Sequence, residues 1–158
     1  MNRIFQIILI LGINYVYPYC VTFSLDLNNF EENPNGNWVV RANGTWNNWG
    51  LGITLRDDDG DNVHTATDCS FSNGTYQFVY AITGDFDGWS NWGISSGPPL
   101  FTDCDYFPND NYANYGFLVD NNDITLDTHS YGCCGLNECS DWEGCHIGAL
   151  QTDNSYLY

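Results

Sequence analysis

Apolar and polar residues alternate along much of the chain between residues 21 and 131. Residues 21–27 are the clearest case, because every second position is apolar, as in a strand that buries one face. The same reading predicts further strands at 38–42, 51–56, 63–67, 75–82, 115–119 and 123–127. No stretch here has the repeat of an amphipathic helix. Short strands separated by turn residues at this spacing predict an all-β antiparallel sandwich over residues 21–131.

Turn residues separate the predicted strands. The acidic stretch 57–62 contains an Asp-Gly hairpin signal, and Asn73-Gly74 and Asn121-Asn122 lie between later strands. The segment 95–114 is rich in Pro and Asn and is long for a loop, so we expect Cys104 within it to form a tether.

The first 20 residues have a different pattern. Arg3 precedes an apolar stretch, residues 4–13, which has about the length of a signal peptide and is too short to span a bilayer. No small-x-small cleavage motif follows, so cleavage is placed only loosely, near Cys20. We expect residues 1–20 to be a secretory signal peptide, which makes the protein extracellular and free of the membrane after processing. The alternative is a retained apolar N-terminal arm.

Cysteine content agrees with secretion, because disulfides persist in oxidising compartments. Cys20 lies in the doubtful zone. The six other cysteines are an even set with an open pairing: Cys69, Cys104, Cys133, Cys134, Cys139 and Cys145. We expect Cys104 to pair with Cys133 or Cys134, since both follow the last strand and begin a disulfide-rich C-terminal tail, residues 132–158. The stretch from Cys139 to His146 lacks the paired spacings of a zinc site, so no metal is expected there.

The charge excludes several partners. Three basic residues, all Arg, stand against 20 acidic ones, and the formal net charge is -17. Nucleic acids are excluded, because affinity for phosphate backbones comes from Lys and Arg. Anionic membranes are disfavoured for the same reason.

Hydrophobic residues make up 43% of the chain, which is enough to bury a core.

Four tryptophans lie in two segments, residues 44–50 and 84–93, among Gly, Asn and Asp and without an apolar run. A Trp in such surroundings exposes at least one ring face. Exposed rings beside short polar side chains suit the faces and hydroxyl edges of sugars. We therefore expect one carbohydrate-binding surface formed by Trp46, Asn47, Asn48, Trp49, Asp85, Asp87, Trp89 and Trp92. The alternative is that these rings only close the end of the sandwich.

Two Asn-Gly-Thr sequons, at Asn43 and Asn73, predict glycosylated surface turns. Because Trp46 follows Asn43 so closely, we expect the bound glycan to belong to a neighbouring copy.

The acidic turn invites a calcium interpretation, but an EF-hand loop that starts at Asp57 needs Gly where Asn62 stands. A solvated hairpin tip is the expectation, and the alternative is a weak calcium site over Asp57 to Asp61.

Catalytic chemistry has little support in the sequence. The three histidines, His64, His129 and His146, lack an accompanying Ser or Cys motif. A module of this size rarely supplies a cleft that holds sugar on both sides of a glycosidic bond. We expect no catalytic residue, no cofactor and no enzymatic activity.

Several ordered strings resemble a secreted module of marine algae and gliding bacteria. They are VTFSLDL, ANGTWNNWG, LRDDDGDNVHTAT, SNGTYQFVYAITGDFDGW and NYGFLVDNNDITLDTHSYGCC, and they span residues 21–134. In that module, strings similar to VTFxVDM, NGxFNGW, MTDxDGDGVYxATV, GTYEYKF and CFGSCxxC recur at similar spacing. It is similar to starch- and glycogen-binding modules, so the resemblance implies an immunoglobulin-like sandwich and a carbohydrate-binding role for the two Trp segments. The strand at 76–80 departs from the family string by having no Lys, and residues 135–158 match none of its strings.

Two functions from different classes follow. The first is a secreted, non-catalytic carbohydrate-binding module that contacts glycan through exposed Trp loops. The alternative is a structural subunit of a self-assembling extracellular glycoprotein filament or surface layer. The apolar arm and the Cys-rich tail support this alternative without displacing the first function, since sandwiches commonly polymerise through donated strands. The arm and the aromatic surface predict a homo-oligomer.

Overall fold

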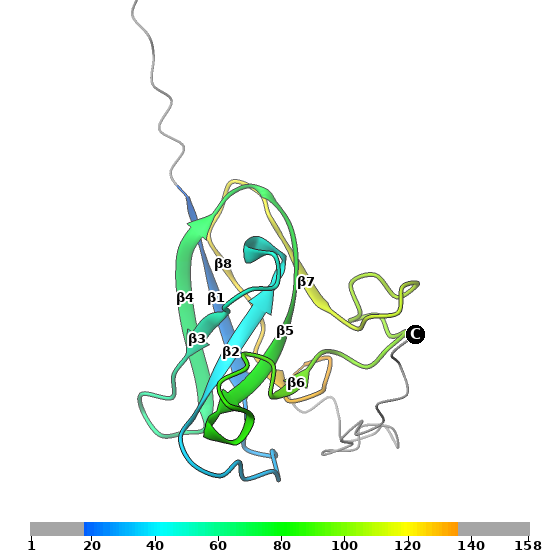
Figure 1. Ribbon diagram of the computed structural model, residues 1–158. Coiled ribbons are helices and arrows are strands. Elements are labelled where there is room, and N and C mark those ends of the chain that lie inside the picture. Colours follow the sequence, from blue (N-terminus) through cyan, green and yellow to red (C-terminus); the bar gives the residue numbers. More distant parts are fainter. Residues whose placement is uncertain (1–17, 136–158) are drawn as a thin grey trace, which may run out of the picture.

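Two β-sheets pack face to face in the computed structural model, which describes residues 18–135 (Figure 1). The first sheet contains β1 (Tyr19–Asp26), β4 (Val63–Phe71), β8 (Ile124–Thr125) and β9 (His129–Ser130). The second contains β2 (Trp38–Gly44), β3 (Ile53–Leu55), β5 (Gly74–Gly84), β6 (Ile94–Ser96) and β7 (Tyr115–Val119). Two 3-10 turns, η1 (Thr45–Asn47) and η2 (Asp85–Asp87), follow β2 and β5. The predicted all-β sandwich is confirmed.

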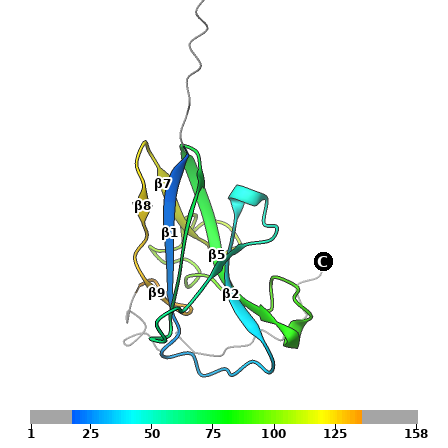
Figure 2. The same cartoon turned by 90° about the vertical axis from the view of Figure 1, so that its left-hand side faces the viewer.

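Strand β1 is the centre of the first sheet. It pairs antiparallel with β4 on one side, and parallel with β8 and then β9 on the other. Figure 2 shows β1, β8 and β9 in one layer and β2 and β5 in the other. The parallel pairs arise because the chain crosses from β7 to the first sheet over residues 120–123. They add to an otherwise antiparallel sandwich.

Strand β5 organises the second sheet. One of its edges pairs with β2 along the whole length of that strand, and the other pairs with β7 and then β6. Strand β3 pairs with the far edge of β2. Strands β6 and β9 were not predicted from the sequence, and β6 begins just before the segment that was expected to be loop.

The core consists of the alternate apolar residues that predicted the strands. Fully buried side chains come from β1, β2, β5 and β7, and include Val21, Phe23, Leu25, Val40, Ala42, Phe78, Tyr80, Ile82 and Val119. Aromatic rings fill much of this space: Phe23 lies 5.3 Å from Phe78 and 5.8 Å from Phe117 between ring centroids. Burying a large apolar side chain stabilises the fold by about 1.5–3 kcal/mol.

No helix within residues 18–135 is long and apolar enough to cross a membrane.

Two disulfides connect the described part of the chain. Cys104 pairs with Cys134, which confirms that the long loop is tethered after the last strand. Cys20 pairs with Cys69, which corrects the expectation that Cys20 stands outside the disulfide set. The reason is the pairing of β1 with β4, which places these two residues side by side. Cys20 is part of β1, so any cleavage that leaves the sandwich intact must fall before Tyr19.

Several predictions fall outside the described residues. They concern the signal peptide or apolar arm up to residue 17, and the part of the Cys-rich tail that contains Cys139, Cys145 and His146.

Candidate functional site

Strands β2 and β5 end in turns with the same backbone. Each strand ends at a Gly, continues into a three-residue 3-10 turn, and then passes through a left-handed residue to a Trp. Trp49 donates its backbone N–H to the Gly44 carbonyl at 2.9 Å, and Trp89 donates to the Gly84 carbonyl at the same distance. The similarity between the two Trp segments is therefore a repeated turn in which Trp49 matches Trp89.

The two turns lie at opposite ends of the sheet (Figure 1). The cause is the antiparallel register of β2 and β5, in which Gly84 pairs with Trp38 and Gly44 pairs with Phe78. For this reason the structure does not bring the four tryptophans into one surface. Trp89 is 47% exposed, and its indole Nε1–H donates to Asp85 within its own turn.

Trp46 points inward and closes one end of the core. Its ring centroid lies 5.4 Å from that of Phe23 and 5.4 Å from that of Phe71. The ring passes so close to Gly44 that a Cβ at this glycine would collide with it. Trp46 is therefore not an exposed ring of a carbohydrate-binding surface. It closes the end of the sandwich, as the alternative interpretation stated.

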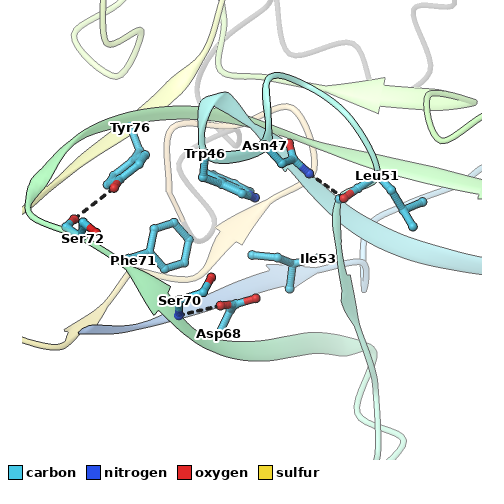
Figure 3. Close-up of a pocket in the computed structure, with 10 residues that line it drawn as sticks. Trp46, Asn47, Leu51, Ile53, Asp68, Ser70, Phe71, Ser72 and Tyr76 are labelled. Atoms are coloured by element: carbon cyan, nitrogen blue, oxygen red, sulfur yellow. Dashed lines mark hydrogen bonds between the residues drawn. The ribbon is translucent and has the colours of Figure 1, made fainter. Parts of the chain in front are cut away.

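A cavity of about 490 Å³ lies beside Trp46, between the end of β4 and the segment that precedes β3 (Figure 3). Ile53, Phe71 and Tyr76 contribute its apolar lining. Polar groups at its edge are bonded within the protein: Asp68 accepts from the Ser70 N–H, and Asn47 donates to the Leu51 carbonyl. The predicted contact residue Asn47 thus stabilises its own turn.

The structure does bring Trp49 and Trp92 together. Their ring centroids are 6.2 Å apart and the ring planes are inclined by 37°. Trp92 is 39% exposed and Trp49 is half-buried. The two rings form one side of a groove of about 760 Å³ on the outer face of the second sheet.

Strand β5 contributes the floor of this groove through Gln77 and Val79, which alternate with the buried core residues of the same strand. The opposite side comes from the long loop between β6 and β7, where Asp110, Asn111 and Tyr112 line the groove. Tyr112 is 72% exposed. We call this site the Trp49–Trp92 groove.

Buried polar contacts hold the long loop in place. The Asp105 carboxylate is buried and accepts the backbone N–H groups of Phe101 and Asn114. The Asn114 Nδ2–H donates to Gln77 Oε1 at 3.2 Å, which joins the loop to β5. Together with the Cys104–Cys134 disulfide, these bonds place Tyr112 across from the Trp pair.

Asp87, a predicted sugar contact, organises the second turn. Its carboxylate accepts from the Thr83 hydroxyl at 2.8 Å, from the Gly84 N–H at 2.7 Å, and from Ser90 and Gly93. Burial acts to raise the pKa of Asp87, but the bonds from Gly84 and Ser90 outweigh it and hold the pKa well below its usual range. Its oxygens are therefore occupied by donors of the protein.

Asp85 has a similar structural role. It accepts from the Asn37 N–H at 2.8 Å and from the Trp89 indole at 3.0 Å, and these bonds lower the pKa of Asp85. Asn48 adopts a left-handed conformation with φ of 56°, which ends the η1 turn. Neither residue is part of the lining of the Trp49–Trp92 groove.

The two sequons differ in accessibility. Asn43 lies within β2 and is 0% exposed, and its Nδ2–H donates to the Asn91 carbonyl at 2.7 Å. The prediction that Asn43 lies at a surface turn is therefore wrong, because the residue belongs to β2 and its amide is buried and bonded. Asn73 is exposed before β5, and donates to Asn121 Oδ1 at 2.8 Å. This second sequon stays a prediction.

Three carboxylates gather at the tip of the β3–β4 connection. Single oxygens of Asp57, Asp59 and Asp61 lie within 4.8 Å of one another. Asp57, however, accepts the backbone N–H groups of Gly60, Asp61 and Asn62. Burial acts to raise the pKa of Asp57, and these donors lower it overall. The bonds identify Asp57 as the residue that shapes the hairpin tip.

Several groove residues were missed by sequence reasoning, namely Gln77, Asp110, Tyr112 and Asn114. The signal that could have found Tyr112 was an aromatic residue between Asn residues in a Pro-rich loop, the same surroundings that identified the tryptophans. The other three have no local signal, since only the fold places them beside the Trp pair.

No protein-family profile matches the chain, and no curated protein matches it either.

Proposed function

We propose that this protein is a secreted, non-catalytic carbohydrate-binding module that holds a glycan chain in the Trp49–Trp92 groove. The observation that supports this most directly is the pair of partly exposed indoles at 6.2 Å beside the amide and hydroxyl groups of the groove. Aromatic faces stack on the C–H faces of sugar rings, while amides bond their hydroxyls. Gln77 on the floor and the exposed Asn111 on the long loop supply such amides.

The charge of the protein indicates the class of glycan. Asp110 lines the groove, and the whole chain has a formal charge of -17. A sulfated or uronic acid-containing glycan would be repelled, so neutral polysaccharides are the proposed ligands. The resemblance of the sequence to starch- and glycogen-binding modules agrees with this class.

Secretion is part of the same proposal. Two disulfides within residues 18–135 are typical of an oxidising compartment. The apolar N-terminal stretch is proposed as the signal peptide.

The proposal is tested by replacing single tryptophans in the mature secreted chain. Trp92→Ala removes one ring of the pair, and Trp89→Ala removes a more exposed ring outside the groove as the matched control. We expect Trp92→Ala to weaken binding to a neutral polysaccharide by about tenfold, the worth of one aromatic contact, and Trp89→Ala to leave it unchanged. Binding is measured by titration after a glycan array, and folding by circular dichroism.

Two results would contradict the proposal. One is a wild-type chain that binds no neutral glycan on the array. The other is an equal loss of binding in both variants, because the groove would then have no special role.

A second function is favoured by the apolar side chains of the long loop. Phe101, Phe107 and Leu118 are large apolar side chains that are exposed on and beside this loop. Such a surface suits a structural subunit of a self-assembling extracellular filament or surface layer. Light scattering of the mature chain across salt concentrations tests it: a particle larger than a monomer that Phe101→Ser dissociates supports this function, and a monomer at every concentration refutes it.

A further inference from the structure

We infer that Asn91 is the residue that positions the Trp49–Trp92 pair, an inference that rests on the proposed function of the groove. Its side chain bridges the two Trp segments. Asn91 Nδ2–H donates to the Gly50 carbonyl at 2.8 Å, and Asn91 Oδ1 accepts the Gly52 N–H at 3.3 Å. Gly50 adjoins Trp49 and Asn91 adjoins Trp92, so one amide joins the immediate neighbours of both rings.

The backbone of Asn91 is bonded as well. Its N–H donates to the Thr83 hydroxyl on β5 at 3.1 Å, and its carbonyl accepts from the Asn43 amide on β2 at 2.7 Å. Asn91 is only 8% exposed. The residue therefore fixes the second Trp segment to two strands of the sheet and, through its side chain, to the first Trp segment. We call these four bonds the Asn91 bridge.

The Asn91 bridge requires asparagine at this position. The backbone has φ of +75°, a left-handed conformation that Asn tolerates better than most residues. The side chain must donate and accept at the same time, which a neutral amide does. Aspartate keeps the shape but presents a carboxylate to the Gly50 carbonyl, and glycine keeps the backbone conformation but removes both side-chain bonds.

Asn91 does not itself contact a ligand, because it is buried and is not part of the groove lining. Its effect on binding is indirect, through the distance and inclination of the two rings. Aromatic platforms tolerate little misplacement, since a loosely held site loses contact with its ligand. Asn91 is thus a positioning residue.

The test has a readout that needs no glycan. Two indoles at this separation couple their electronic transitions and produce an exciton couplet in the circular dichroism spectrum. The Trp92→Phe variant lacks one indole of the pair and serves as the reference without this coupling. We expect Asn91→Gly and Asn91→Asp in the mature chain to fold, and to reduce the couplet toward that of Trp92→Phe. Val119→Ala, a destabilising core variant on β7, is the control that should keep the couplet.

Binding to soluble starch and glycogen is measured on the same variants. We expect Asn91→Gly to bind up to about tenfold more weakly, which corresponds to one misplaced ring contact, while Val119→Ala binds as wild type does. An intact couplet in both Asn91 variants would overturn the inference. If the couplet is lost but wild type binds no glycan, the positioning role of Asn91 stands and the proposed function falls.

Discussion

Short polar side chains determine how each turn presents its tryptophan. Asp87 accepts several donors from its own turn, Asp85 holds the Trp89 indole, and Asn91 joins the two Trp segments. Hydrogen bonds to a charged acceptor are stronger than neutral ones, so the bonds to Asp85 and Asp87 stabilise the second turn. At this scale the polar residues of the Trp segments are mainly structural.

The lowered pKa of Asp87 predicts an acid-sensitive contribution to stability. A carboxyl whose pKa is depressed on folding stabilises the fold fully above its unfolded pKa of about 4, and this stability is lost as the pH falls below that value. Asp87→Asn should lower the free energy of unfolding by about 1–3 kcal/mol at neutral pH, because its bonds involve a charged acceptor. The difference from wild type should shrink in acid, as measured by urea unfolding at several pH values. A constant difference would contradict this assignment.

The buried sequon gives a second prediction at this scale. When the chain passes through a eukaryotic secretory pathway, we expect a glycan on Asn73 and none on Asn43, because the Asn43 amide is enclosed and bonded to the Asn91 carbonyl. Peptide mass spectrometry of the folded, secreted protein measures both sites. Asn73→Gln serves as the control and should remove all N-linked glycan. A glycan on Asn43 of folded protein would show that the Asn91 bridge is broken.

At the level of elements, the repeated turn has different consequences after β2 and after β5. Both turns place a Trp after a left-handed residue, but only the first also places an aromatic ring, Trp46, over the open end of the core. The equivalent position in the second turn, Phe86, is exposed. The same local backbone therefore closes the sandwich at one end and leaves a solvent-facing loop at the other.

Stability measurements should separate these roles. Trp46→Ala removes a ring that packs on Phe23 and Phe71, so it should lower the free energy of unfolding by about 3 kcal/mol. Trp49→Ala, the matched variant in the same turn, should change it by less than about 1 kcal/mol, because that ring lies in the groove. Denaturant unfolding followed by circular dichroism gives both values. Equal losses would mean that Trp49 is also part of the core.

The whole molecule combines a strongly acidic surface with a groove whose lining is uncharged except for Asp110. Its formal charge of -17 repels anionic chains over a distance that shortens as salt is added. We therefore expect binding to neutral polysaccharides to change little with salt, because stacking and amide hydrogen bonds need no net charge.

Sulfated and uronic acid-containing polysaccharides should not bind at low salt. Titrations of both classes at low and physiological ionic strength check this, with Asp110→Asn as the variant that reduces local repulsion in the groove. Strong binding of a sulfated glycan at low salt would contradict the proposed ligand class.

The alternating pattern was sufficient to predict most strands, because burial of one sheet face imposes a period of two on the sequence itself. It located β1, β2, β5 and β7 closely and identified the all-β sandwich. Local composition likewise located the Trp turns, since left-handed residues and tight turns need Gly and Asn. The tether from Cys104 followed from the length of its loop, and is confirmed as the bond to Cys134.

Tertiary structure alone decided which tryptophans meet. Trp46 and Trp49 are close in sequence, yet one enters the core and the other joins Trp92, because the β2–β5 register and the Asn91 bridge connect segments about forty residues apart. The same long-range contacts bury Asn43 and bring Tyr112 to the groove. A local sequence pattern indicates only which side of an element is buried. The pairing of Trp49 with Trp92, the burial of Asn43 and the position of Tyr112 therefore could not be predicted from the neighbouring residues.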